Sequence, residues 1–241
     1  MAISILAPKT QIYYPETDGK PMAETLQHIL VITYLLSALR DYFRNALDVY
    51  VGANNLIYYE EGEPSSVFAP DCYVIFGLDK TPRRVYKLWQ EKRVPSVTFE
   101  ITSHSTWMED LGNKRVLYAK LGVQEYFIYD VEHADLEPPL QGFRLEQGEY
   151  VRIVPDEHGR LVSRELGLTL QEIDGTLRLI HPATNEIVLT PDESYEAARE
   201  AEEAAREAEQ AAREAEAHTR AVEQENARLR AELEKLRGKQ A

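Results

Sequence analysis

The sequence predicts a mixed α/β domain followed by one long helix. Three observations support this fold class: an amphipathic helical pattern early in the chain, a series of short β-branched and aromatic runs after it, and a change of composition at Thr190. The chain has 241 residues, of which 44% are hydrophobic and 28% are charged. These values are ordinary for a folded protein and exclude a wholly disordered chain.

The first element is expected to be a helix from Met22 to Ala46. Apolar residues recur there at spacings of three and four, which is the period of a helix with a broad buried face. These residues are Leu26, Ile29, Leu30, Ile32, Leu35, Leu36, Leu39, Phe43 and, just beyond, Leu47.

Three strands are expected next. Residues 48–59 indicate a strand or a bulged hairpin arm, and residues 72–77 indicate a buried strand. Residues 96–102 alternate apolar and polar side chains, which is typical of a half-buried strand. A helix over 107–121, ending at Gly122, and a strand over 125–130 complete an α-β-β-β-α-β order.

The segment 140–190 has short alternating runs broken by Gln-Gly, His-Gly and Asp-Gly pairs. Such pairs favour tight turns between antiparallel strands, so we expect a small β annex packed on the core. The predicted organisation is therefore a core over residues 1–139, the annex over 140–190 and a C-terminal helix over 191–241.

The C-terminal helix has a marked beginning and a heptad repeat. Thr190 is a candidate N-cap, Pro191 suits the first helical position, and Glu193 can close a capping box. Small or apolar residues then recur at two positions in every seven. The a positions are Ala198, Ala205, Ala212, Thr219, Asn226 and Leu233, and the d positions are Ala201, Ala208, Ala215, Val222, Leu229 and Leu236.

This pattern predicts a homodimer through a parallel coiled coil. Asn226 at an a position favours a defined register, and Glu225 and Glu232 at g face Arg230 and Arg237 at e of a neighbouring chain. The alternative is a solitary charged helix stabilised by Glu–Arg pairs within one chain, because alanine seams bind weakly.

The charge balance limits the partners of the protein. The chain has 27 Lys and Arg against 41 Asp and Glu, a net charge of −14, which disfavours non-specific adhesion to DNA or anionic membranes. A local basic segment over residues 80–93 contains Tyr86 and Trp89 and could contact a phosphate backbone. Equally, these two aromatic residues could anchor the segment to the protein body.

The expected location is the cytoplasm. Cys72 is the only cysteine, which fits a reducing compartment. The N-terminus lacks the basic leader of a signal peptide, and no run approaches the ~20 apolar residues that span a bilayer, so we expect no membrane partner.

Acidic and basic residues that could form a catalytic site occur on neighbouring predicted elements. Asp71 follows Pro70 at the mouth of a strand, Glu100 lies on the polar face of the next long strand, and Asp110 and Lys114 are four residues apart on the following helix. Two carboxylates on adjacent strands can hold a hard cation such as Mg²⁺ and leave positions for water and a phosphate oxygen. With a nearby lysine, this combination suits phosphodiester hydrolysis.

Three sequence runs carry a resemblance to a known family: PDCYVIFG, PSVTFEITSHST and EDLGNKRVLYAKLGVQEYFIYD. Together they resemble the Uma-type putative restriction endonuclease family of the PD-(D/E)XK nuclease superfamily, and the likeness extends from about Tyr14 to Pro191. The resemblance implies a restriction-endonuclease-like core with a mixed central sheet flanked by helices.

The resemblance also implies roles for individual residues. Asp71 and Glu100 correspond to the metal ligands, with Mg²⁺ as the cofactor and Mn²⁺ as a substitute. The superfamily's lysine two residues after the acid is replaced by Thr102, and Lys114 matches the position to which this family is thought to have moved it. In the alternative, Lys114 is a surface lysine paired with Asp110. Asp110 and Tyr118, at four-residue spacing from Lys114, could orient it, whereas His104 is not assigned a role.

Two residues of the first helix complete the candidate site. Glu24 is a candidate further catalytic acid, and His28, four residues on, could support the site. The expected function is a magnesium-dependent DNA endonuclease that dimerises through its coiled coil. The alternatives are a catalytically inactive nuclease-fold module that binds or scaffolds a partner, and a structural oligomer in which the helix is a spacer.

Overall fold

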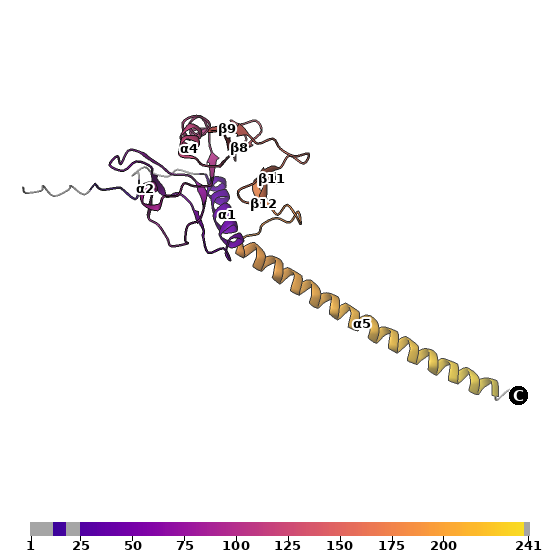
Figure 1. Cartoon of the computed structure of the whole chain (residues 1–241). Helices are drawn as coiled ribbons and strands as arrows, with labels where there is room; N and C mark the ends of the chain where they lie inside the picture. Colours follow the sequence, from indigo (N-terminus) through magenta and orange to yellow (C-terminus); the bar gives the residue numbers. More distant parts are fainter. Residues whose placement is uncertain (1–11, 18–24, 239–241) are drawn as a thin grey trace, which may run out of the picture. The chain divides into compact units, whose positions relative to one another are not determined.

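The computed structural model of the protein describes residues 12–17 and 25–238. The chain divides into two compact units, Met1–Thr190 and Pro191–Ala241. Figure 1 traces both units in the order of the sequence.

A six-stranded mixed sheet forms the centre of the first unit. Its strand order is β1-β4-β6-β7-β8-β9. Only β6 and β7 are parallel to each other, and every other neighbouring pair is antiparallel. The strands are β1 (Val49–Gly52), β4 (Cys72–Phe76), β6 (Val97–Thr102), β7 (Glu125–Asp130), β8 (Leu140–Glu146) and β9 (Glu149–Arg152).

The parallel pair β6/β7 is joined by a helical connection, as parallel strands require. The connection consists of α3 (Trp107–Glu109), a π-helical turn η1 (Asp110–Lys114) and α4 (Arg115–Leu121). Gly122 ends α4 in the left-handed region with φ 89°, a conformation that glycine adopts without steric cost. The helix predicted over 107–121 is thus present, with a π-helical turn that its sequence did not indicate.

One face of the sheet packs against α1 (Leu26–Tyr42) and a three-stranded antiparallel sheet, with which it shares a hydrophobic core. The strands of this smaller sheet are β10 (Leu161–Ser163), β11 (Leu168–Ile173) and β12 (Thr176–Ile180). In α1 the buried residues include Val31, Tyr34 and Ala38, whereas Leu26, Ile29 and Leu30 are exposed. The predicted apolar face of the first helix was therefore partly wrong, because the sheet meets the helix along a neighbouring stripe.

The opposite face of the sheet packs against α4 and a second small sheet in a core rich in tyrosine. This sheet has the order β3-β2-β5. Its strands are β2 (Leu56–Tyr58), β3 (Val67–Phe68) and β5 (Val85–Lys87), and the short helix α2 (Leu88–Glu91) follows β5. Because both faces of the large sheet are covered, β6 is buried along its whole length and is not the half-buried strand that its alternation suggested.

Two further differences from the predicted elements concern strand pairing. Residues 48–59 form β1 and β2, which belong to different sheets, since the chain turns at Asn54 with φ 52°. Strands β8 and β9 extend the large sheet, since β8 pairs with β7 and β9 pairs with β8. Residues 140–152 are therefore part of the main sheet, and only β10 to β12 form a separate antiparallel sheet.

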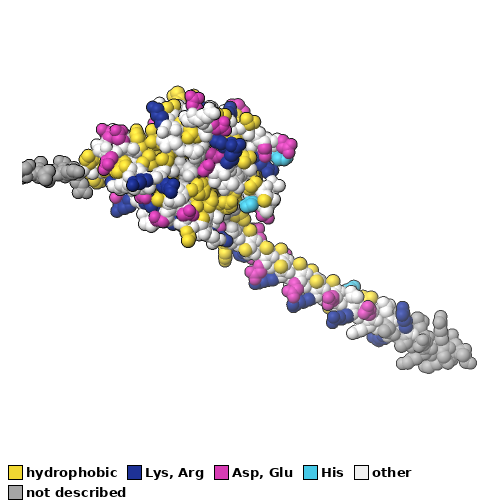
Figure 2. Space-filling model, viewed as in Figure 1, with side chains coloured by type: hydrophobic (Ala, Val, Ile, Leu, Met, Phe, Trp, Pro, Cys, Tyr) yellow, Lys and Arg dark blue, Asp and Glu magenta, His cyan; other side chains and the backbone are white. Residues whose placement is uncertain are grey.

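The second unit is the helix α5 (Pro191–Gly238). Its ion pairs run within the helix, between Arg206 and Glu202 and between Arg213 and Glu209 among others. Figure 2 shows hydrophobic side chains along one side of this helix and acidic and basic side chains along the other. Among the described residues, none of the helices combines the length and apolar character that crossing a bilayer requires.

A buried carboxylate joins the large sheet to the β10 sheet. Glu125 of β7 is 1% exposed. Its Oε1 accepts hydrogen bonds from Arg144 Nη2 at 2.8 Å and from the Arg164 backbone N–H at 2.9 Å. Its Oε2 accepts one from Ser163 Oγ at 2.5 Å. The contacts with Ser163 and Arg164 therefore join the two sheets, whereas Arg144 lies on β8 of the same sheet as Glu125.

Replacing Glu125 with alanine is expected to lower the free energy of unfolding by about 3–5 kcal/mol, because it leaves the Arg144 guanidinium buried without its carboxylate. The matched control is Glu149→Ala on the neighbouring part of the sheet, where the side chain is exposed and a change within about 0.5 kcal/mol is expected. Urea denaturation measures both variants. Equal effects of the two substitutions would contradict the role given to Glu125.

Candidate active site

The pairing of β4 with β6 places two carboxylates opposite each other. Cys72 pairs with Phe99 in this antiparallel ladder, so the next position in register sets Asp71 opposite Glu100. Directly opposite residues project to the same face of a sheet. The Asp71 carboxylate also caps the ladder, because its Oδ2 accepts a hydrogen bond from the Ile101 backbone N–H at 2.7 Å. The Pro-Asp sequence therefore directly precedes β4 and fixes an acidic side chain beside β6.

The Glu100 carboxylate is 1% exposed and is held through both of its oxygens. Oε2 accepts a hydrogen bond from Lys114 Nζ at 2.7 Å, and Oε1 accepts one from the Tyr118 hydroxyl at 2.5 Å. Burial raises the pKa of Glu100, and although Lys114 opposes this, the value remains about 8. The metal-free site thus favours the protonated form of this acid near neutral pH.

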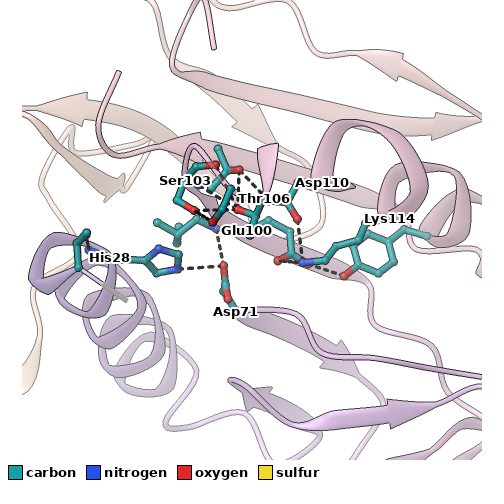
Figure 3. A network of polar contacts seen from close by, with 12 residues as sticks. His28, Asp71, Glu100, Ser103, Thr106, Asp110 and Lys114 are labelled. Carbon is teal, nitrogen blue, oxygen red and sulfur yellow. Dashed lines mark hydrogen bonds and ion pairs between the residues drawn. The ribbon is translucent and has the colours of Figure 1, made fainter. Parts of the chain in front are cut away.

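Lys114 bridges two acidic side chains. Its Nζ lies 2.7 Å from Glu100 Oε2 and 2.8 Å from Asp110 Oδ1. Burial lowers the pKa of this ammonium, but the carboxylates of Glu100, Asp110 and Asp71 outweigh burial and raise it above its ordinary value. Lys114 therefore remains positively charged at neutral pH. Figure 3 shows its nitrogen beside the carboxylates of Glu100 and Asp110.

The π-helical turn η1 carries Asp110 at one end and Lys114 at the other. Such turns widen the helix locally and are frequent at functional sites. Asp110 is held in place by Thr102, whose hydroxyl donates to Asp110 Oδ2 at 2.8 Å, and by Tyr126, whose hydroxyl donates to the Asp110 carbonyl at 2.9 Å. Thr102, which stands where a lysine was expected, thus supports the acid that pairs with Lys114.

His28 approaches Asp71 from α1. Its Nε2 lies 3.5 Å from Asp71 Oδ2, and both side chains are largely buried. The backbone N–H of His28 donates to the Thr25 hydroxyl, the N-cap of α1, which fixes the first turn of the helix. The structure therefore brings His28 to the site, whereas Glu24 lies outside the described residues.

Two other expectations concern the neighbourhood of the site. Tyr118 does converge on the cluster, but its hydroxyl donates to Glu100 and not to Lys114. The sequence pattern did not indicate whether the Tyr118 hydroxyl would contact Lys114 or Glu100, because the helical spacing places Tyr118 near Lys114 but does not report contacts with β6. His104 is exposed, and its Nδ1 lies 3.0 Å from Asp135 Oδ1.

The basic segment over residues 80–93 is largely paired within the chain. Tyr86 is fully buried and its hydroxyl donates to the Arg93 carbonyl at 2.9 Å. Arg83 pairs with Glu91, and Arg84 pairs with Glu16. This arrangement favours the interpretation that the aromatic residues anchor the segment to the protein body.

The donor set at the site fits a hard divalent cation. Asp71 and Glu100 supply carboxylate oxygens, the ligands that Mg²⁺ prefers, and Mg²⁺ retains several waters when it binds to one or two carboxylates. Within residues 12–17 and 25–238, no group of three or more His, Cys, Asp and Glu side chains is arranged to hold a metal ion. Asp71 and Glu100 are the carboxylates of this cluster that could contribute oxygen ligands, and both oxygens of Glu100 are engaged by Lys114 and Tyr118.

The chain is similar to one described protein family and to a solved structure. The profile of the family Uma2, described as "Putative restriction endonuclease", matches residues 7–179. A search of curated proteins finds no match. Among solved structures, the chain resembles a putative nuclease belonging to DUF820 from Anabaena variabilis ATCC 29413, with 14% sequence identity and a TM-score of 0.44, over 63% of this chain and 81% of that one.

Raising the pH is expected to destabilise the metal-free wild-type protein relative to a Glu100→Gln variant between about pH 5 and pH 8. The pKa of Glu100 rises from its ordinary 4.5 to about 8 on folding. In this window the folded state retains a proton that the unfolded state has lost. The stability of the wild type therefore falls with pH relative to the variant, by at most about 1.4 kcal/mol per pH unit.

Urea denaturation at several pH values measures this difference. Parallel pH profiles for the two proteins would show that Glu100 is already ionised in the folded state at pH 5. That result would contradict the dominance of burial over the Lys114 ion pair.

Proposed function

This chain belongs to the Uma2 family of putative restriction endonucleases, and from this premise we propose that it is a divalent-metal-dependent DNA endonuclease with its active site at Asp71, Glu100 and Lys114. One observation carries the proposal. Lys114 Nζ on η1 lies 2.7 Å from Glu100 Oε2 on β6, and Asp71, directly before β4, accepts a hydrogen bond at 2.7 Å from the backbone N–H of Ile101, the residue after Glu100.

The division of roles follows from the contacts of each side chain. Asp71 and Glu100 would hold the cation, and the Ile101 N–H and His28 position the Asp71 carboxylate. The chemistry that a bound divalent cation supplies is activation of a water and polarisation of the scissile phosphate. Lys114 would stabilise the negative charge that develops on the phosphate, a task for which a permanently charged, pre-positioned donor is suited.

The cluster has a closed form and an open form in this proposal. Without a cation, Lys114 and Tyr118 occupy the two oxygens of Glu100. The Glu100 carboxyl would have to lose its proton to hold a cation, so metal affinity would fall as the pH is lowered. Lys114, whose side chain is 23% exposed, would then turn from Glu100 to the substrate while keeping its ion pair with Asp110.

Substitution at the cluster is expected to abolish metal-dependent cleavage. Asp71→Asn and Glu100→Gln remove metal-binding charge at nearly constant shape, and Lys114→Met is expected to slow cleavage about 10²- to 10³-fold, the usual cost of losing one charge-stabilising donor. Conversion of supercoiled plasmid at low salt, with Mg²⁺ or Mn²⁺ and with EDTA, measures the rates.

The matched control for this assay is Glu149→Gln, which changes an exposed carboxylate and should cut at the wild-type rate. Cleavage that survives both Asp71→Asn and Glu100→Gln would contradict the proposed site. The alternative, a nuclease-fold module without catalytic activity, predicts that the wild type neither cuts nor binds Mn²⁺ in a calorimetric titration.

We further propose that the protein is a homodimer through α5. The ion pairs of Arg206 with Glu202 and Arg213 with Glu209 lie at b and e positions of the heptads, so they leave the a and d seam uncovered. Val222, at a d position, is 46% exposed in the single chain. A second copy of the helix is the partner that would bury such a seam.

Charges introduced in the seam are expected to dissociate the dimer. Val222→Glu combined with Leu229→Glu places two charges at d positions, whereas Gln224→Glu combined with Ala231→Glu adds the same charges at outward f positions. Sedimentation equilibrium of the full-length proteins should find the first variant monomeric and the second dimeric. A monomeric wild type would contradict the proposal and favour the solitary charged helix.

A further inference from the structure

A basic pocket lies at the C-terminal end of α1 and includes Lys80 and Arg83 of the basic segment over residues 80–93. A pocket of about 470 Å³ is lined there by residues of α1, β1 and the segment after β4. Four cationic side chains, Arg40, Arg44, Lys80 and Arg83, line it, and no acidic residue does. This is unusual for a chain with a net charge of −14, in which a concentration of positive charge needs a reason.

Two of these cations have no carboxylate partner among the residues that the structure describes. Lys80 Nζ donates to the carbonyls of Phe43 at 2.7 Å and Arg44 at 2.9 Å. Arg40 donates through Nε and Nη2 to the Val51 carbonyl at 3.3 and 3.2 Å. These bonds fix both side chains at the pocket without neutralising them. Lysine has three donors and arginine has five, so each retains donors for a ligand.

The other two cations are paired with acids that lie outside the pocket lining. Arg44 pairs with Asp41, and Arg83 pairs with Glu91 and Asp79. The Arg83 guanidinium also lies 5.1 Å from the centre of the Tyr50 ring, so it is held in place by this ring as well as by its two ion pairs. The uncompensated charge of the pocket is therefore that of Arg40 and Lys80.

The volume and the lining residues of the pocket favour a small ligand. Its volume of about 470 Å³ lies within the usual range for small-molecule sites. Phe43, Tyr50 and Pro82 contribute apolar walls beside the cations. An anion with an attached ring system matches this combination better than an inorganic ion alone.

We propose that this pocket binds the phosphate ester of a single nucleotide, with Arg40 and Lys80 as the phosphate ligands. The nucleotide is either free or the 5′-phosphorylated end of a DNA strand. The pocket is distinct from the Asp71 and Glu100 cluster, because Arg40 lies twelve residues after His28 on α1, about 18 Å along the helix axis.

Calorimetric titration of the full-length protein with 5′-dAMP tests this proposal. The buffer contains EDTA, so that the carboxylate cluster does not contribute through bound metal. We expect 5′-dAMP to bind with at least tenfold higher affinity than deoxyadenosine. Lys80→Gln and Arg40→Gln should each weaken 5′-dAMP binding about tenfold or more, and Lys120→Gln, an exposed lysine on α4, should not.

Further measurements distinguish a free nucleotide from the 5′-phosphorylated end of a DNA strand and test whether each variant is folded. If 5′-dAMP does not bind, the same DNA duplex is titrated with and without 5′-phosphates. Tighter binding of the phosphorylated duplex identifies a DNA end as the ligand and supports the site. Arg40→Lys retains the charge and should recover part of the affinity lost in Arg40→Gln. Circular dichroism establishes that each variant is folded.

The test is independent of the proposed nuclease activity. Glu100→Gln should abolish cleavage and still bind 5′-dAMP with wild-type affinity. Equal affinity for 5′-dAMP and deoxyadenosine, equal affinity of the wild type and folded Lys80→Gln, or absence of binding by every phosphorylated ligand would overturn the proposal.

Discussion

The burial of the Glu100 carboxyl is the constraint on which the site depends. A buried acid without partners would cost several kcal/mol, and the chain meets this cost with the ammonium of Lys114 and the hydroxyl of Tyr118. Both partners come from the connection between β6 and β7, so the helix that makes the parallel crossover also stabilises the acid. The balance is incomplete, because the pKa of Glu100 remains raised to about 8.

The surrounding structure supports this arrangement in two ways. The β4/β6 ladder sets Asp71 opposite Glu100, which fixes the spacing of the two carboxylates through backbone pairing. The π-helical turn brings Lys114 to the Glu100 carboxylate and Asp110 to Lys114, while Thr102 of β6 holds the Asp110 carboxylate. In the proposed site, Lys114 from η1 would serve in place of a lysine on β6, and Thr102 on that strand holds the Asp110 carboxylate that pairs with Lys114.

Several of these features could be predicted from the sequence and others could not. The proximity of Asp71, Glu100 and Lys114 follows from a strand order that local patterns indicate. The partner of Tyr118 and the π-helical turn depend on atomic packing that no periodicity encodes. The assignment of β8 and β9 to an annex was wrong because hairpin signals show that strands pair, but not which sheet they join. The exposed side of α1 was misjudged for a similar reason, since residues such as Leu26 and Ile29 match a helical period without contacting the sheet.

The central claim is that Asp71 and Glu100 together bind a divalent cation. Anomalous diffraction from crystals of the protein soaked in Mn²⁺ measures this directly. The account predicts a peak between the two carboxylates, with Lys114 displaced from Glu100 and still in contact with Asp110. Crystals that show no peak at this position, with the Lys114 to Glu100 ion pair intact at saturating Mn²⁺ and pH 8 or above, would contradict it.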